Sequence, residues 1–149
     1  MKTILVPVDF SDVTPAVIEA AKKMGKAFGS RIILLHVVEV NLPPVELVPG
    51  ISAPGTIGVA VPVREDAKWE HRKMEEAKKH FAGSSLKVST LVVEGEKLPT
   101  ILAKSKNADL IVIGSHGHGA LFHLLAGSLA SGVLKSANIP VLVVPSPRK

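Results

Sequence analysis

The 149-residue chain has no cysteine and no tyrosine, and its aromatic residues are four phenylalanines and one tryptophan. The absence of cysteine excludes disulfide bonds and thiolate metal sites, and it fits a reducing compartment. With so few aromatic rings, the hydrophobic core has to be built from valine, isoleucine, leucine and alanine. Nucleic acid is commonly bound by stacking of bases on aromatic side chains, and this chain has almost no such side chains.

Long apolar runs are also missing from the sequence. No stretch approaches the ~18 consecutive apolar residues of a membrane-spanning helix. The N-terminal segment MKTILVPVDF holds a short apolar run that Pro7 and Asp9 interrupt, which is too short for the core of a secretory signal. The net charge of +5 comes from lysines and arginines spread over several predicted helices, as expected for solvated surfaces. We therefore expect a cytoplasmic protein with no membrane and no nucleic-acid partner.

What the sequence does contain is an alternation of apolar runs and amphipathic segments. With 46% hydrophobic and 21% charged residues, residues 1–149 are expected to form a single domain. The alternation predicts an α/β fold, an open and doubly wound five-stranded parallel sheet of the Rossmann-like type with helices on both faces. One reversal of direction after the third strand gives the strand order 3-2-1-4-5. The strands are predicted at residues 3–8, 32–38, 87–93, 110–113 and 141–144.

The first predicted helix follows Asp9 and ends at Gly29, a residue suited to a helix C-terminus. Its cap is expected to be Ser11, Asp12 or Thr14, with Pro15 in the first turn. Its inward positions at helical spacing are Val17, Ala20, Ala21, Met24, Ala27 and Phe28.

The second helix is predicted at residues 64–82 and the third at residues 97–106. In the second helix, Glu75 and Lys79 have a favourable spacing on the solvent side, and Trp69 lies away from the buried stripe. That stripe is expected to contain Ala67, Met74, Ala77 and Phe81. In the second strand, His36 is expected to be a core histidine satisfied by one hydrogen bond rather than a ligand.

A long variable loop is predicted at about residues 40–63, where the periodic pattern stops. This segment is rich in proline and glycine and also holds several apolar residues. Loops of this length inside a domain are uncommon. Two interpretations remain open: the segment packs on a partner subunit or on the ligand entrance, or it is flexible cover over the edge of the domain.

Glycines cluster after the fourth predicted strand, in the segment GSHGHGALFHLLAGS. Gly114 directly follows the strand, and Gly127 with Ser128 stands where the last helix should begin. Glycine lets the backbone approach a ligand closely, and a helix N-terminus offers unpaired N–H groups to an anion. The segment therefore predicts a phosphate cradle. It should lie across from Asp9, because ligands bind at the carboxyl ends of strands beside the switch point.

Three common phosphate-handling motifs do not fit the chain. No Gly-x-x-x-x-Gly-Lys-Ser/Thr sequence occurs in it. The first strand leads into Asp9 and Phe10 instead of the glycines of a dinucleotide fingerprint. A receiver domain would need an aspartate at the end of the third strand, where Glu94 and Gly95 stand.

The spacing Gly114-x-x-Gly117, nine residues, then Gly127-Ser128 resembles the nucleotide-binding motif of the universal stress protein family. The resemblance extends over the whole chain, through VPVDFSD, LLHV, IVIGSHG and PVLVV. It implies a stress-response or regulatory module of the ATP-binding branch, which holds an adenine nucleotide between strands one and four. It also implies a homodimer formed through the C-terminal strand Val141–Val144, and regulatory protein partners.

The same resemblance assigns expected roles to residues at the ends of the first, second and fourth strands. Asp9 and the backbone near Val37 are expected to hold the adenine, with Pro7 and Val8 lining the base pocket. Gly114 is expected beside the ribose. Two simpler interpretations stay open, in which Asp9 caps the first helix and Gly114 only forms a turn at the end of its strand.

The phosphates of ATP are expected at the glycine-rich segment and at the start of the last helix. A dedicated zinc site at His116, His118 and His123 is not expected, because no further ligand type accompanies them. Mg²⁺ or Mn²⁺, where present, would be carried by the phosphates. The residues expected on this side are Ser115, Gly117, His118, Gly127, Ser128 and Leu129.

Catalysis is not a strong expectation. No lysine or arginine stands between Gly114 and Lys135, so a cationic clamp for phosphoryl transfer is missing from this segment. The first interpretation is therefore a binding module with at most weak ATP hydrolysis. The alternatives are a slow ATPase, and a scaffolding or chaperone-like protein whose site is vestigial.

Overall fold

The computed structural model describes residues 1–39, 67–115 and 127–146. Strands and helices alternate in the described chain as predicted, and each strand begins and ends within one residue of its predicted bounds. The predicted helix start at residues 64–66 and the predicted loop at 40–63 lie outside the described residues. The elements are β1 (Thr3–Pro7), α1 (Thr14–Phe28), β2 (Arg31–Val38), α2 (Ala67–Lys79), β3 (Val88–Glu94), α3 (Lys97–Ser105), β4 (Leu110–Gly114), α4 (Ser128–Ser136) and β5 (Val141–Val144).

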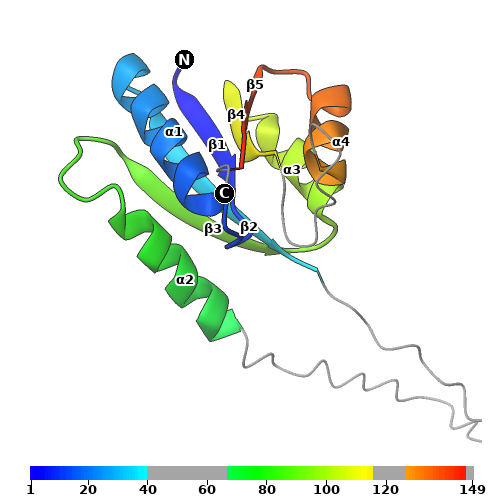
Figure 1. The fold of residues 1–149 in the computed structure, drawn as a ribbon, viewed down its shortest axis with the longest axis horizontal. Coiled ribbons are helices and arrows are strands. Elements are labelled where there is room, and N and C mark those ends of the chain that lie inside the picture. Colours follow the sequence, from blue (N-terminus) through cyan, green and yellow to red (C-terminus); the bar gives the residue numbers. More distant parts are fainter. Residues whose placement is uncertain (40–66, 116–126, 147–149) are drawn as a thin grey trace, which may run out of the picture.

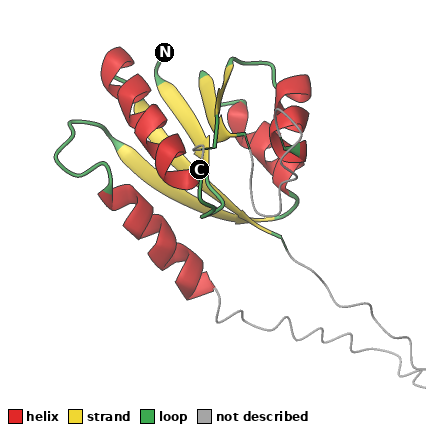
Figure 2. Ribbon diagram, viewed as in Figure 1, coloured by secondary structure: helices red, strands yellow, loops and turns green. Residues whose placement is uncertain are grey.

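The strands form one parallel sheet in the order β3-β2-β1-β4-β5, which confirms the predicted topology. Helices cover both faces of this twisted sheet, α1 and α2 on one face and α3 and α4 on the other (Figure 1). Figure 2 shows the same layers, with the yellow strands between the red helices. Because the chain reverses direction after β3, β1 and β4 are neighbours in the middle of the sheet.

The core is aliphatic and has two parts, one on each face of the sheet. Along β1, Ile4 and Val6 pack toward α1 and α2, whereas Leu5 packs toward α3 and α4. Since both faces of the central strands are covered, those strands are nearly continuous apolar runs in the sequence. Within the described ranges, no helix has both the length and the apolar character needed to cross a bilayer.

The start of α1 differs from the prediction. The helix has Val13 as its N-cap and no side-chain capping bond, so the predicted capping by Ser11, Asp12 or Thr14 was wrong. The hydroxyl groups of Ser11 and Thr14 donate hydrogen bonds to Asp9 instead of serving the helix end. The prediction of proline in the first turn is confirmed.

The end of α1 is only partly as predicted. Gly29 ends the helix in the left-handed conformation, with φ of 61°, as a glycine C-cap should. Phe28 and Ala27 were predicted to face inward, yet residues 26–29 are all exposed and Phe28 is 53% exposed. The last turn therefore extends beyond the surface that the helix covers, and helical spacing alone could not reveal where that cover stops.

In α2 the predicted stripe is confirmed for the side chains that are described. Met74 and Ala77 are buried, and so is Phe81, which lies in the turn after the helix because α2 ends at Lys79 and not at the predicted residue 82; the side chain of Ala67 lies outside the described part. Glu75 is on the solvent side as expected. Its carboxylate accepts a 3.2 Å hydrogen bond from the Thr90 hydroxyl of β3, instead of pairing with a lysine of its own helix.

Asp109 joins the beginnings of β1 and β4. Its carboxylate oxygen Oδ2 accepts 2.8 Å hydrogen bonds from the backbone N–H groups of Lys2 and Thr3. These two donors are the main reason why the pKa of the Asp109 carboxyl lies below its ordinary value. Because the folded state favours the charged form, this contribution to stability is complete above the ordinary carboxyl pKa of about 3.9 and is lost as the pH falls below it.

We expect Asp109→Asn to lower the stability of the protein at pH 6, and the difference from the wild type to shrink at pH 3. The asparagine retains a carbonyl acceptor but removes the charge that the two N–H groups stabilise. Denaturant unfolding at both pH values measures the difference, with Asp12→Asn as a control for removal of an exposed carboxylate. An equal loss of stability at both pH values would contradict this account.

Candidate functional site

At the carboxyl edge of the sheet, β1 stops before its neighbours do. Pro7, its last residue, pairs with Leu35, while β2 continues to Val38. On the other side β4 continues to Gly114. Since the chain changes direction between β1 and β4, the space beyond the end of β1 is where open parallel sheets bind ligands. We call this space, bounded by the ends of β2 and β4, the switch-point site.

Backbone polar groups of β2 and β4 face the switch-point site. Leu35 accepts a hydrogen bond from Val8 N on the β1 side, and Val38 accepts one from Gly95 N on the β3 side. Residues of a strand alternate between their two neighbours, so the N–H and C=O of Val37 point to the β1 side, where β1 has ended. Likewise Ser115 N donates to Val144 O of β5, which leaves the Gly114 groups pointing to the β1 side.

Asp9 is the first charged residue after β1, and its Oδ1 atom organises the following turn. It accepts hydrogen bonds from Ser11 N at 3.0 Å, from Ser11 Oγ at 2.5 Å and from Thr14 Oγ1 at 3.3 Å. The interpretation of Asp9 as the cap of the first helix was wrong, because the N-cap of α1 is Val13 without a side-chain bond, and Asp9 instead holds the turn before the helix. This bonding also fixes the carboxylate at the edge of the switch-point site, which is compatible with a ligand role.

An aromatic group of three rings lies beside Asp9. Phe10 has φ of 60°, a left-handed conformation that is costly for a residue with a side chain. Its ring packs on His36 with centroids 4.5 Å apart and is nearly perpendicular to the Trp69 ring, with centroids 5.7 Å apart. His36 Nδ1 donates a 2.8 Å hydrogen bond to Val8 O, as the prediction of one satisfying bond requires, although the ring is half-buried rather than fully buried.

Gly114 is required by packing as well as by any ligand. A Cβ atom at this position would lie 2.6 Å from Cγ1 of Val13 and 3.3 Å from Cγ2 of Val17. The end of β4 therefore touches the first turn of α1, next to the turn that holds Asp9. The interpretation of Gly114 as a simple turn residue is therefore incomplete, because this close contact with α1 also requires glycine.

Ser115 connects β4, β5 and α4. Its side chain is buried, its Oγ accepts a 3.1 Å hydrogen bond from Ser146 N after β5, and its carbonyl accepts a hydrogen bond from Gly127 N. Gly127, the N-cap of α4, therefore already uses its own N–H. Its carbonyl accepts the first helical bond, from Ser131 N at 2.9 Å. The N–H groups of the first helical turn, those of Ser128, Leu129 and Ala130, are thus the ones that α4 offers to an anion.

The structure brings most of the predicted site residues to one edge of the sheet. Gly117 and His118 lie outside the described residues, as do His116 and His123. In the described part of the chain, no three side chains of the His, Cys, Asp or Glu type come together as a ligand set for a metal ion. The residues at this edge are Pro7, Val8, Asp9, Val37, Gly114, Ser115, Gly127, Ser128 and Leu129.

Sequence reasoning missed three contributors to this edge. Thr14 helps to hold Asp9, and its position five residues further on gave no sign of this bond. The left-handed Phe10 has no sequence signal, because the conformation usually marks glycine or asparagine. The Ala130 amide could have been predicted, since the first turn of any helix leaves its N–H groups unpaired.

Comparison with known proteins gives consistent results along the whole chain. The model of the universal stress protein family matches residues 1–145. The chain is 34% identical to universal stress protein MJ0531 of Methanocaldococcus jannaschii, in an alignment covering 99% of this chain and 84% of that protein. Universal stress protein UspA from Lactobacillus plantarum has a similar structure, with a TM-score of 0.75, 26% identity and coverage of 96% of this chain and 97% of that one.

Two more distant structures with the same fold were solved with nucleotides. One is the universal stress protein from Archaeoglobus fulgidus in complex with dAMP, with a TM-score of 0.66, 21% identity and coverage of 97% and 98% of the two chains. The other is a universal stress protein in complex with cAMP, with a TM-score of 0.69, 19% identity and coverage of 98% of both chains.

Proposed function

The chain belongs to the universal stress protein family, and on this basis we propose that it is a cytoplasmic regulatory module that binds ATP and acts as a homodimer with protein partners in the stress response. The nucleotide would occupy the switch-point site. Its adenine would lie against Asp9 and the backbone of Val37, above Pro7 and Val8, with the ribose beside Gly114. Its phosphates would lie toward α4.

The observation that carries this proposal is the direction of the backbone groups around the end of β1. Val37 and Gly114 face the same space from opposite sides, and Gly127 at the start of α4 is bonded to Ser115, the residue after Gly114. Backbone donors and acceptors at a fixed spacing can recognise the edge of a base, while helix amides suit phosphate oxygens. The complexes of two family members with dAMP and cAMP support an adenine nucleotide as the ligand.

ATP is favoured over a monophosphate by the supply of anion donors. The amides of Ser128, Leu129 and Ala130 form one group at the start of α4, and the Ser128 hydroxyl adds a fourth donor. The predicted contributions of Gly117 and His118 would extend this group. Mg²⁺ or Mn²⁺ would arrive with the phosphates, since these ions prefer phosphate oxygens and water.

Binding rather than turnover is the activity that these groups support. Backbone amides stabilise phosphate charge, but phosphoryl transfer also needs a group that positions water and usually a cationic clamp. Lys97, at the start of α3, does not supply such a clamp, because its ammonium group is paired with Glu39 at 3.5 Å. A slow ATPase and a scaffold with a vestigial site are the alternatives, and nucleotide titration together with a phosphate-release assay separates both from the proposal.

Calorimetric titration with ATP, ADP and AMP, each with and without Mg²⁺ and Mn²⁺, tests the proposal directly. Saturable binding of ATP is expected, together with less than one turnover per hour in a phosphate-release assay. Release of phosphate over repeated turnovers would favour the slow ATPase, and absence of binding to any adenine nucleotide would favour the vestigial scaffold.

Gly127→Trp should abolish ATP binding and leave cooperative unfolding intact. Gly127 has φ of −62° and ψ of 166°, which any residue can adopt, so the substitution does not strain the backbone. The large side chain would instead fill the space in front of the α4 amides. Ser136→Trp, at the exposed far end of the same helix, is the matched control. Unchanged affinity in Gly127→Trp would place the phosphates elsewhere.

The homodimer is proposed to form through β5. Pro140 and Val144 direct their carbonyl groups toward β4, so Val141 and Val143 direct their N–H and C=O groups away from the sheet. β5 is thus an edge strand with apolar side chains and outward backbone groups, which favours pairing with another strand.

Val143→Pro should weaken the dimer at least tenfold. It removes an outward N–H group that the sheet of one subunit does not use, and edge strands tolerate proline at such positions. Sedimentation equilibrium measures the dimer constant, with Val143→Ala as a control that trims the side chain but keeps the N–H. A wild-type protein that stays monomeric would remove the dimer from the proposal.

A further inference from the structure

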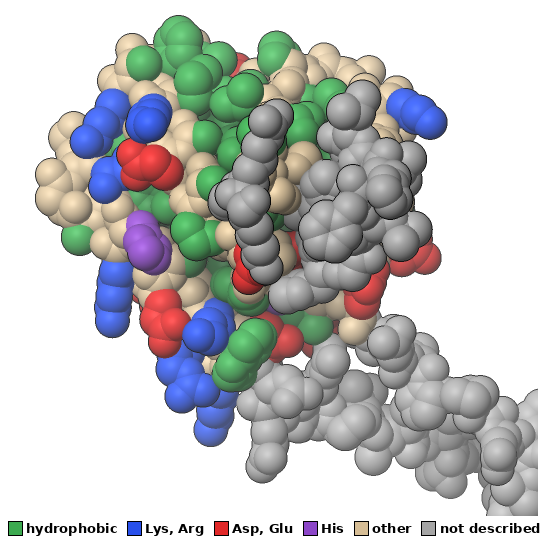
Figure 3. Space-filling model, viewed as in Figure 1, with side chains coloured by type: hydrophobic (Ala, Val, Ile, Leu, Met, Phe, Trp, Pro, Cys, Tyr) green, Lys and Arg blue, Asp and Glu red, His purple; other side chains and the backbone are tan. Residues whose placement is uncertain are grey.

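The edge of the sheet opposite the switch-point site is strongly basic. Helices that follow parallel strands run back along the sheet, so their C-terminal turns lie at the amino ends of the strands. Figure 3 shows lysine and arginine side chains along the left-hand side of the view, over α1 and α2. Each of the helices α1 to α4 has lysine in its last turn, at Lys26, at Lys78 and Lys79, at Lys104 and at Lys135.

Lysine at a helix C-terminus has an ordinary structural explanation, because it offsets the partial negative charge of the helix end. That explanation does not apply to Lys2, Arg31 and Lys87, because they lie at or just before the first residues of the strands β1, β2 and β3. These three cations come from separate parts of the chain to one edge of the sheet. Their presence there calls for a different account.

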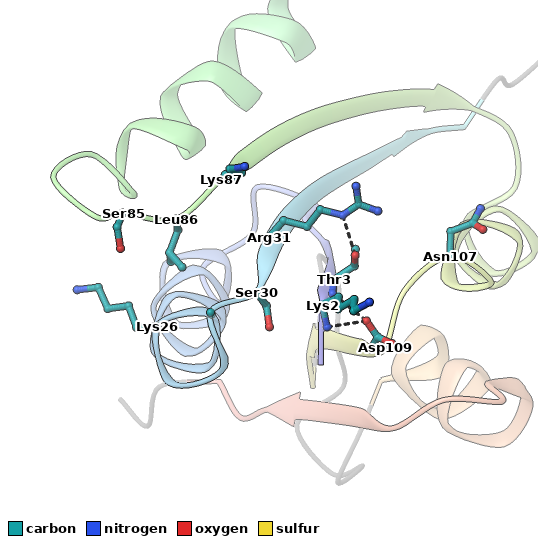
Figure 4. Close-up of a pocket in the computed structure, with 12 residues that line it drawn as sticks. Lys2, Thr3, Lys26, Ser30, Arg31, Ser85, Leu86, Lys87, Asn107 and Asp109 are labelled. Carbon is teal, nitrogen blue, oxygen red and sulfur yellow. Dashed lines mark hydrogen bonds between the residues drawn. The ribbon is translucent and has the colours of Figure 1, made fainter.

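The three cations line a concave surface that we call the amino-end basin. It has a volume of about 690 Å³, within the range of small-molecule sites. Figure 4 shows its residues, with Arg31 extending past Thr3 and Lys87 standing near Ser85 and Leu86. The lining consists of Lys2, Thr3, Gly25, Lys26, Gly29, Ser30, Arg31, Ser85, Leu86, Lys87, Asn107 and Asp109.

Most of the positive charge in the amino-end basin is not neutralised. In the part of the chain that the structure describes, the ammonium groups of Lys26 and Lys87 have no hydrogen-bond or ion-pair partner. Arg31 donates one hydrogen bond from Nε, at 2.7 Å to the Thr3 hydroxyl, which orients its guanidinium group. Asp109 is the one acidic lining residue, and its carboxylate already accepts the N–H groups of Lys2 and Thr3.

The remaining lining residues restrict the chemistry of a ligand. Leu86 is the one large apolar side chain among them, and no aromatic ring is present in the lining. A nucleobase would find no ring to stack on, and a lipid chain would find almost no apolar surface. Cations, hydroxyls and an amide instead suit a small and highly charged anion. The lysines of the helix ends would attract such an anion by raising the local positive potential.

We propose that the amino-end basin binds a compact soluble anion that carries two or more phosphate groups. Arg31, oriented by Thr3, would bind one phosphate and Lys87 another, while Lys26, which points away from both in Figure 4, would add to the positive potential of the basin. This site is at the opposite edge of the sheet from the switch-point site and does not depend on it.

Inorganic triphosphate is the probe for this proposal, added to the full chain without divalent metal at low ionic strength. Amide shifts in ¹⁵N NMR spectra locate the site, and calorimetry gives the affinity. Saturable shifts are expected at Ser30, Arg31 and Lys87. The double variant Lys26→Gln/Lys87→Gln should bind at least tenfold more weakly, and both side chains are exposed, so the fold should not change.

The double variant Lys68→Gln/Arg72→Gln is the matched control. It removes the same charge from exposed positions in the first turns of α2, away from the basin. Equal weakening in the two double variants would reduce the effect to net charge and overturn the proposal. Shifts confined to Gly114, Ser115 and residues 127–130 would also overturn it, because triphosphate would then occupy the switch-point site. Shifts that grow linearly without saturation would show that the basin has no specific binding site, and would likewise overturn the proposal.

Discussion

Replacing Gly114 by alanine is expected to destabilise the protein by about 1–3 kcal/mol, the usual range for an added methyl group in a packed core. The new Cβ would lie 2.6 Å from Val13 Cγ1, a distance that side-chain carbons do not tolerate. Val13 is 4% exposed and branched at Cβ, so it cannot rotate away. The first turn of α1 would have to move, and Asp9 is bonded to this turn through Thr14. Nucleotide affinity should therefore fall together with stability.

The variant Gly114→Ala/Val13→Ala tests whether the contact with Val13 causes this loss of stability. Trimming Val13 removes both Cγ atoms, so the double variant should be more stable than the sum of the single effects predicts. Gly132→Ala is the control for a methyl group added elsewhere. Its Cβ would lie 2.8 Å from Cδ2 of Leu98, the far end of a flexible side chain, and alanine favours the helix, so its effect should be small. Denaturant unfolding of the wild type, the single variants Gly114→Ala and Val13→Ala, the double variant and Gly132→Ala decides, and strict additivity would contradict the packing account.

Asp9→Asn is expected to weaken ATP binding at least tenfold and to remove the preference for adenine over guanine nucleotides. Asparagine keeps a carbonyl oxygen for the bonds to Ser11 and Thr14, so the turn should persist. Its amide replaces a carboxylate oxygen that could accept the amino group of adenine, and a donor would then face a donor. Asp9→Asn should therefore keep the structural role of Asp9 in the turn and lose its role in binding the base.

Asp9→Ala provides the comparison, because it removes the acceptor for the turn as well. It should lose about 1–3 kcal/mol of stability, the cost of leaving buried donors unpaired, whereas Asp9→Asn should lose less than about 1 kcal/mol. Titrations with ATP and GTP on both variants measure the ligand role. If Asp9→Asn bound ATP as the wild type does, Asp9 would be a residue of the turn alone.

Much of the fold could be predicted because its strands are continuous apolar runs between helices. Burial on both faces leaves such runs in β1, β2 and β4, and alternation with helices implies parallel pairing and the position of the switch point. What could not be predicted depends on contacts between residues distant in sequence. The extent of cover over α1 decided the exposure of Phe28, and the close contact of Gly114 with Val13 exists only once β4 lies beside α1.

The candidate site was predictable to a similar degree. Glycine and serine at the start of α4 gave the position of the anion donors, but not the bond from Gly127 N to Ser115 that removes one of them. The amino-end basin left no motif, because Lys26, Arg31 and Lys87 belong to different elements and form one surface only in the folded chain. Charge spread along a sequence can therefore be concentrated in space.

Trp69 makes the protein a natural optical sensor of its own switch-point site. It is the one tryptophan, and the chain has no tyrosine, so nearly all ultraviolet emission comes from this indole. The ring is 44% exposed and touches Phe10, the residue after Asp9. A change in the turn at Asp9 would alter the surroundings of the indole and the wavelength of its emission. Unlabelled protein can then be followed on the millisecond scale, fast enough to separate the encounter with a ligand from any later rearrangement.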